Sequence, residues 1–212
     1  IQQGCQRAEW LNQRSYRVSR NQKILVIASG NPSKVNEIRA MLAPVALDVQ
    51  QQPKGLEIEE TGSTYLENAR LKASQVALLC GNWALADDSG LEVDALGGAP
   101  GIFSARYAPS DKERIDRLLH ELKQSLYRSA GFHSAVALSD PSGTIRLEAE
   151  GLCRGEILIA PRGDGFGYDP VFWIKEANST YAQLPAHQKM KLGSRGKAIR
   201  AIAAEMGSLM GF

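Results

Sequence analysis

The sequence is poor in cysteine and histidine and lacks a long apolar run. Its three cysteines, Cys5, Cys80 and Cys153, are far apart and form no Cys-x-x-Cys pair, which argues against a disulfide framework and a zinc site. The three histidines are equally scattered, so a histidine metal site has little support. No uninterrupted apolar stretch approaches the roughly 20 residues that a membrane helix needs. We therefore expect a cytoplasmic protein with no membrane partner.

Internal repeats, low-complexity tracts and clear linkers are also absent. With 212 residues, 43% of them hydrophobic and 23% charged, the chain has the size and composition of one sizeable globular domain. The net charge of +2 is uneven, because residues 1–23 hold five basic residues against one acidic residue and leave a net charge of −2 for the rest. A mildly acidic body argues against a nucleic-acid partner. We predict a basic N-terminal extension over residues 1–22 and a single domain over residues 23–212.

The character of residues 1–22 stays open at this point. An Arg-rich, acid-poor segment weakly resembles a transit peptide. A helical extension, or residues upstream of the natural start, fits the same composition at least as well.

The hydrophobic pattern alternates between strands and helices, and strands dominate after Gly131. Residues 23–28 predict a buried strand, and Asn31 before Pro32 suits a helix start. Thr64-x-x-Glu67 is typical of a capping box, with Gly81 ending that helix. The other expected elements are strands at 45–49, 83–87, 91–94, 132–138 and 171–174, a helix over 110–126, a hairpin turn at 141–143, a strand pair over 144–159 and a helix over 194–210. These elements predict a mixed α/β fold.

Asp87-Asp88-Ser89-Gly90 is the most informative stretch of the chain. Two adjacent carboxylates follow an apolar run, as if a buried strand delivered them to the edge of a sheet. Like charges side by side are unfavourable away from water unless a cation or a hydrogen-bond network compensates them. A divalent metal that holds a phosphate and activates water is the economical explanation. The same residues also form a good turn sequence, because Asp and Ser bond nearby backbone and Gly accepts a positive φ.

Two other segments have the chemistry of a nucleotide site. Asn31 and Lys34 lie at a helix N-terminus, where free amides, the helix dipole and a lysine favour an anion, although no Walker A loop is present. In the glycine-rich segment 163–170, Phe166 can stack on a base and Asp169 can accept hydrogen bonds. The plain alternatives are a capped helix with a solvated lysine, and a glycine-rich hairpin whose aromatic residues join a minor core.

Three motifs then carry a family resemblance. They are Ser29-x-Asn31-x-x-Lys34-x-x-Glu37, the block from Ala86-Asp87-Asp88-Ser89-Gly90-Leu91 to Ser104-Ala105-Arg106-Tyr107, and Gly165-Phe166-Gly167-Tyr168-Asp169-Pro170-x-Phe172. Together they resemble the inosine triphosphate pyrophosphatase family over residues 23–210. The resemblance implies a two-lobed α/β fold around a long mixed sheet, an active site in the cleft between the lobes, and a homodimer. It also implies Mg²⁺-dependent hydrolysis of non-standard purine nucleotides (ITP, dITP and XTP) to the monophosphate and pyrophosphate.

The resemblance assigns roles to particular residues. Asp88 matches the general base, and Glu60, Asp88 and Asp87 match metal-binding carboxylates. The positions that match substrate contacts are Ser29, Gly30, Asn31, Pro32, Ser33, Lys34, Ser89, Phe166, Gly167, Tyr168, Asp169, Lys189, Ser194 and Arg195. Ser194 stands where the family usually has a histidine that helps to read the 6-oxo group of the purine. A serine is shorter but can still donate, so the substitution bears on selectivity against ATP and GTP rather than on catalysis.

Two other functions remain open on the sequence. One is a nucleotide-binding or sensing protein with weak catalysis, whose Arg-rich segment contacts another macromolecule. The acids Glu60, Asp87 and Asp88 favour an enzyme over that reading, because a pure binder need not keep acids facing a polyanion. The other is a Maf-type pyrophosphatase acting on modified pyrimidines, against which the long second motif argues.

Overall fold

The computed structural model describes residues 23–211, so the predicted basic extension over residues 1–22 lies outside the described residues. Its centre is one seven-stranded sheet in the order β2-β1-β3-β4-β5-β6-β7. The strands are β1 (Lys23–Ile27), β2 (Leu47–Gln51), β3 (Trp83–Val93), β4 (Ser129–Ser139), β5 (Ile145–Ile157), β6 (Phe172–Ile174) and β7 (Ser179–Thr180). β1 is parallel to β2 and β3, and the other neighbouring pairs are antiparallel. The prediction of a mixed α/β fold is confirmed.

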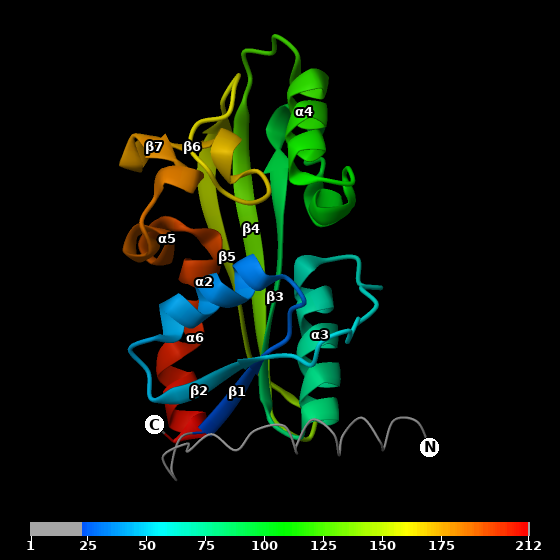
Figure 1. Cartoon of the computed structure of the whole chain (residues 1–212), viewed down its shortest axis with the longest axis vertical. Coiled ribbons are helices and arrows are strands. Elements are labelled where there is room, and N and C mark those ends of the chain that lie inside the picture. Colours follow the sequence, from blue (N-terminus) through cyan, green and yellow to red (C-terminus); the bar gives the residue numbers. More distant parts are fainter. Residues whose placement is uncertain (1–22, 212) are drawn as a thin grey trace.

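Helices cover both faces of this sheet (Figure 1). They are α2 (Pro32–Leu42), α3 (Tyr65–Cys80), α4 (Asp111–Leu122), α5 (Ala186–Leu192) and α6 (Ser194–Met210). The long strands β3, β4 and β5 run along the length of the molecule, with α3 on one side and α6 on the other. Across residues 23–211, the structure contains no helix with the length and apolar character to span a membrane.

The two faces of the sheet hold separate hydrophobic cores. Leu85 packs with α2 and α6, whereas its neighbours Ala84 and Ala86 pack with α3. Successive side chains of a strand point to opposite faces, so residues 84–86 of β3 alternate between these two cores. Further along the strand, Leu91 and Val93 join a third core with α4. The same alternation continues through Asp87 and Asp88. The two adjacent acids therefore lie on opposite faces of the sheet.

The predicted starts of α2 and α3 are both present. The side chain of Asn31 accepts hydrogen bonds from the amides of Ser33 and Lys34, with Pro32 as the first helical residue of α2. Thr64 caps α3 through the amide of Glu67, and Gly81 ends that helix with a φ of 63°. The Glu67 carboxylate accepts from the amide and the hydroxyl of Ser63. It therefore helps to fix the start of α3, but it binds the residue before the N-cap in place of the amide of Thr64 itself.

Two strand predictions were wrong. β3 is continuous from Trp83 to Val93, so the acid pair lies in the middle of a central strand and forms neither a turn nor an edge. β5 is likewise one strand where a strand pair was expected. Glycine suggests a break, but Gly151 is needed for close packing: a Cβ there would lie 2.1 Å from the carbonyl oxygen of Ser194 on α6.

Two helix predictions also need correction. α4 ends at Leu122, and Leu126 lies beyond it with 93% of its surface exposed, although its spacing fitted the apolar stripe. The short helix α5 was not predicted. Its seven residues carry no side-chain cap and contain none of the buried residues that produce a helical hydrophobic pattern.

Candidate active site

A buried charge cluster surrounds Asp87 on the face of the sheet covered by α2 and α6. Lys34 from the first turn of α2 places its Nζ 2.9 Å from Asp87 Oδ2. Arg195 from the first turn of α6 places its Nε 3.1 Å from Asp87 Oδ1, and it also pairs with Glu37 of α2. Ser89 donates its hydroxyl to the same carboxylate. One strand and two helix starts are thus joined at a single carboxylate.

This cluster fixes the charge of Asp87. Burial alone would raise the pKa of Asp87, but the charges of Arg195 and Lys34 outweigh burial and hold that pKa well below its usual range. Asp87 is 1% exposed and Arg195 is 6% exposed. Removing one partner of such a pair would leave the other charge buried without compensation. Asp87 therefore holds two cations in place.

A second acidic group lies on the opposite face, against α3. Lys72 of α3 places its Nζ 2.8 Å from Asp88 Oδ1 and 2.9 Å from Glu60 Oε1, so one ammonium joins acids that are 28 positions apart in the chain. Asn68, one turn earlier, donates to the other oxygen of Asp88 at 3.4 Å. Arg106 lies 3.6 Å from the second oxygen of Glu60. The structure thus brings Glu60 and Asp88 together.

The two carboxyls of this pair are shifted in opposite directions. Burial raises the pKa of Asp88 above its ordinary value, even though Lys72 opposes the shift. Burial acts on Glu60 in the same direction, but there the charges of Lys72, Lys34 and Arg106 outweigh it and lower the pKa. The charge of Lys34 acts on both carboxyls as well as on Asp87. The charge of Lys34 therefore favours the ionised form of all three carboxyls.

The pair has the chemistry of a divalent-cation site. Carboxylate oxygens are the ligands that Mg²⁺ prefers, and the place between Glu60 and Asp88 already holds a cation, the ammonium of Lys72. Within residues 23–211, no three His, Cys, Asp or Glu side chains come together as a metal site. Asp87, the third predicted metal ligand, faces away from the pair and is occupied by Lys34 and Arg195. Two protein carboxylates fit Mg²⁺, which commonly keeps several waters and takes further oxygens from a substrate phosphate.

A cavity of about 200 Å³ collects most of the predicted substrate contacts. Its lining includes Asn31, Ser33, Lys34, Ser89, Phe166, Gly167, Tyr168, Asp169, Ser194 and Arg195. Ser29, Gly30 and Pro32 do not line it, and Lys189 lines the neighbouring cavity instead. Residues from four distant segments of the chain therefore meet around one hollow.

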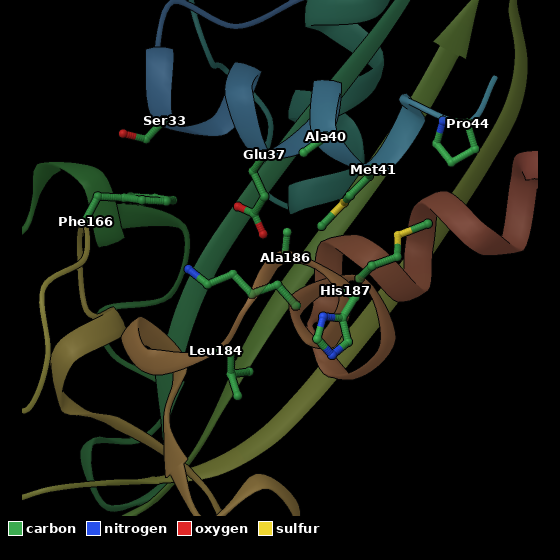
Figure 2. Close-up of a pocket in the computed structure, with 11 residues that line it drawn as sticks. Ser33, Glu37, Ala40, Met41, Pro44, Phe166, Leu184, Ala186 and His187 are labelled. Atoms are coloured by element: carbon green, nitrogen blue, oxygen red, sulfur yellow. The ribbon is translucent and has the colours of Figure 1, made fainter. Parts of the chain in front are cut away.

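A larger cavity of about 590 Å³ lies between α2 and α5 (Figure 2). Figure 2 shows Phe166 at one side of it, Glu37 reaching in from α2, and Leu184, Ala186 and His187 on the side away from α2. Phe166 and Ser33 line both cavities. Phe166 therefore lines both the smaller cavity, which has many polar side chains in its wall, and the larger, mostly apolar one.

The segment around Phe166 is held by contacts from three directions. The Tyr168 hydroxyl donates to the carbonyl of Ser104 at 3.0 Å. Asp169 forms an ion pair with Lys189 of α5 at 3.0 Å, and burial raises the pKa of Asp169 to about 6 despite that lysine. The amide of Gly167 donates to Asp111 of α4 at 2.7 Å.

Ser194 belongs to a chain of hydroxyls on the wall of the smaller cavity. Its Oγ lies 2.8 Å from Ser134 Oγ on β4, and Ser134 donates to Ser89 Oγ at 3.1 Å. Ser89 in turn donates to Asp87, which is ionised. The residue at the expected histidine position is thus tied by hydrogen bonds to the charge cluster of Asp87.

Comparison with known proteins places the chain in a family. The Ham1 family profile matches residues 25–205. The chain belongs to the Ham1 family. It is 50% identical over 189 residues to a dITP/XTP pyrophosphatase of Parasynechococcus marenigrum (strain WH8102), covering 89% of this chain and 97% of that protein. A dITP/XTP pyrophosphatase of Nostoc sp. (strain PCC 7120) is also 50% identical, with 89% and 96% covered. These matches confirm the resemblance to the pyrophosphatase family.

A solved Ham1 structure matches the fold over the same region. The HAM1 protein from Coxiella burnetii is 38% identical, with a TM-score of 0.77, and the match covers 88% of this chain and all of that one. The described sheet and helices therefore have the architecture of a solved Ham1 protein.

Sequence reasoning missed several residues of this site. Lys72 and Asn68 lie one turn apart on α3, beside the buried stripe of Ala69 and Ala73, and both face Asp88. A lysine and an asparagine next to a small-residue stripe were the signal that could have identified them. Ser134 lay in an apolar strand pattern, where only its hydroxyl marked it as unusual.

Proposed function

We propose that this Ham1-family chain is a nucleoside triphosphate pyrophosphatase that hydrolyses dITP, ITP and XTP to the monophosphate and pyrophosphate, and so cleanses the nucleotide pool. The names and identities of its relatives support this assignment. The observation that carries it is the joining of Glu60 and Asp88 by one cation, Asp88 being next in sequence to Asp87, which pairs with the lysine at the start of α2. Acids and cations in this arrangement suit a polyanionic substrate with a divalent ion.

The triphosphate is held by cations and amides at the start of α2. A helix N-terminus offers free backbone amides and a partial positive charge, and Lys34 adds a full charge. Lys34 and Arg195 both line the smaller cavity, where Ser89 and Ser33 supply hydroxyls. Asp87 keeps Lys34 and Arg195 aligned for this task, so we assign it a positioning role in place of the metal-binding role expected from the resemblance.

Asp88 acts on the attacking water. Its pKa is raised by burial, which makes its ionised form a better proton acceptor than an ordinary aspartate. Asn68 and Lys72 hold one oxygen each and so fix the direction of the carboxylate. Glu60 and Asp88 would hold Mg²⁺, which when bound neutralises phosphate charge and polarises water.

Phe166 and its neighbours receive the base. The ring can stack on a purine, and the backbone of Gly167 carries no side chain to block the approach of a flat ligand. Asp169 and Lys189, which pair at 3.0 Å, offer an acceptor and a donor to the edge of the base. Ser194 contributes a hydroxyl at the position where the family's histidine reads the 6-oxo group.

The assignment is tested by pyrophosphate release. Purified protein is incubated with ITP, XTP, dITP, GTP and ATP in the presence of Mg²⁺, with the Asp88→Asn variant as control. We expect turnover of ITP, dITP and XTP that exceeds turnover of GTP and ATP and falls at least 100-fold in the variant, on the order expected for loss of a general base. Absence of ITP turnover above the variant would refute the assignment.

Binding of the cation is tested separately by calorimetric titration of Mg²⁺ together with a non-hydrolysable triphosphate. We expect Glu60→Gln and Asp88→Asn to weaken Mg²⁺ binding, and Asp87→Asn not to change its stoichiometry. Equal weakening by all three would restore Asp87 to the metal set.

We also propose that the chain is a cytoplasmic homodimer with two lobes and its active site in the cleft between them. Sedimentation of the purified protein tests the dimer, and a sedimentation coefficient of a 23.1 kDa monomer would contradict it.

A further inference from the structure

The segment that presents Phe166 makes few hydrogen bonds of its own. Residues Gly163, Asp164 and Gly165 are exposed, and Gly167 has a φ of 60°. Two hydrogen bonds involve the backbone of Phe166 and Gly167: Phe166 O accepts from the amide of Asp169, and the Gly167 amide donates to Asp111. A glycine-rich segment has many accessible backbone conformations, so external contacts must select one of them.

Asp111 makes such an external contact with the backbone of Gly167. It is the first residue of α4, but the capping of that helix is already done by Ser110 and Glu113, which form a reciprocal capping box. The carboxylate of Asp111 is therefore free to reach elsewhere. Its Oδ2 accepts from the Gly167 amide at 2.7 Å, across 56 positions of sequence, and the distance is that of a strong, charge-assisted hydrogen bond.

The other oxygen of Asp111 is fixed to its own helix. Arg114, one turn later, places Nη1 2.7 Å from Asp111 Oδ1. The same guanidinium donates through Nε to the carbonyl of Ala108 at 2.9 Å. Arg114 thus ties the carboxylate to the start of α4 and to the loop before it. Asp111 and Arg114 both line the smaller cavity, next to Phe166 and Gly167.

We propose that Asp111 is a positioning residue, whose carboxylate fixes the backbone of Gly167 and so holds Phe166 in the orientation that receives the base. The inference rests on the proposed function, in which Phe166 binds the base, whereas the hydrogen bond between Asp111 and Gly167 is observed in the structure independently of that function. It adds a residue of α4 to the site, outside the three motifs that carry the family resemblance. The phosphates bind at the start of α2 and do not depend on this contact.

The kinetic test uses Asp111→Ala and Asp111→Asn. Alanine removes the acceptor, and we expect KM for ITP to rise about tenfold while kcat changes by less than about twofold. Asparagine keeps an oxygen that can accept from Gly167, so KM should return close to the wild-type value. The inhibition constant of inorganic tripolyphosphate, which has no base, should be the same in all of these proteins.

The matched control is Asp116→Ala. Asp116 lies on the same helix, pairs with Lys112 at 2.6 Å, and has 58% of its side chain exposed. Its loss removes one acid and one ion pair from α4 without touching the segment around Phe166, so KM for ITP should stay at the wild-type value. A rise in KM equal to that of Asp111→Ala would assign the effect to the helix as a whole and overturn the proposal.

Amide hydrogen exchange at Gly167 tests the contact without catalysis. In nucleotide-free protein we expect exchange of this amide to accelerate at least about tenfold in Asp111→Ala and to be restored in Asp111→Asn. Unchanged exchange, or a fall in kcat with KM unaltered, would overturn the proposal. If the wild type turned over no ITP, the proposed function would fail, and the Gly167 exchange rate would still decide whether Asp111 holds the segment.

Discussion

We expect substitution of Asp87 to reduce mainly the stability of the protein, and substitution of the adjacent Asp88 to reduce mainly its catalytic turnover. Asp87→Asn removes a carboxylate that is 1% exposed, so Lys34 loses its ion pair at 2.9 Å and Arg195 keeps Glu37 as its remaining carboxylate partner. Breaking a buried ion pair from one side costs about 3–5 kcal/mol of unfolding free energy. For a domain of this size, Tm falls by about 2–4 °C per kcal/mol. We therefore expect Tm to fall by roughly 6–20 °C in Asp87→Asn.

Asp88→Asn should behave differently although the two residues are adjacent. Burial raises the pKa of Asp88, so its charged form is not favoured by the fold, and the amide oxygen of asparagine can still accept from Lys72. Lys72 also keeps Glu60 as a partner at 2.9 Å. We expect Tm to stay within about 3 °C of the wild type, and ITP turnover to fall by about 10²–10⁴-fold.

The assays are thermal unfolding followed by circular dichroism and pyrophosphate release from ITP, on the two variants and the wild type. Activity of Asp87→Asn is measured well below its Tm, so that loss of folded protein is not counted as loss of catalysis. The reasoning fails if both variants lose the same stability, because the division of the acids between two faces of the sheet would then have no energetic consequence. A Tm of Asp87→Asn within about 2 °C of the wild type would refute the ion-pair argument by itself.

Three further outcomes follow from the same contacts. Phe166→Ala should raise KM for ITP by the equivalent of about 1–3 kcal/mol, with kcat little changed, and an unchanged KM would remove Phe166 from the site. Lys34→Ala should depress turnover of every triphosphate alike in pyrophosphate-release assays, and a selective loss for one base would contradict a phosphate contact. Because burial raises the pKa of Asp169 to about 6, its native form binds more protons than its unfolded form between about pH 4 and pH 6, and stability from this group is lost as pH rises through that window. Urea unfolding should therefore show the stability of Asp169→Asn relative to wild type improving by up to about 3 kcal/mol from pH 4 to pH 7, whereas a constant difference would refute the assigned pKa.

Local signals in the sequence were sufficient for the helix starts and for the order of the elements. Asn31 with Pro32, and Thr64 with Glu67, each act within one turn, so their effect does not depend on the rest of the fold. The terminal helix was predicted with its observed bounds for the same reason. Gly151 shows where this reasoning stops, because its strand position is explained by the approach of α6, which is 43 residues away at Ser194.

The adjacent carboxylates show a second limit, and it concerns the site itself. In the sequence, Asp87 and Asp88 are adjacent like charges, for which compensation by a shared cation is the simplest expectation. In a strand, successive side chains point to opposite faces, so each acid has its own compensation. Lys34 and Arg195 neutralise Asp87, and Lys72 neutralises Asp88.

The placement of the two acids on opposite faces determines which of them is suited to bind a metal ion and to activate a water molecule. Asp87 is held by two cations from α2 and α6 in a buried cluster, and its oxygens are fully used. Asp88 shares the single ammonium of Lys72 with Glu60, and a lysine side chain has a flexible four-carbon stem, whereas the planar guanidinium of Arg195 bridges Asp87 and Glu37 in a rigid geometry. Between two neighbouring aspartates, the one with the movable partner and the second carboxylate beside it is therefore the one suited to catalysis.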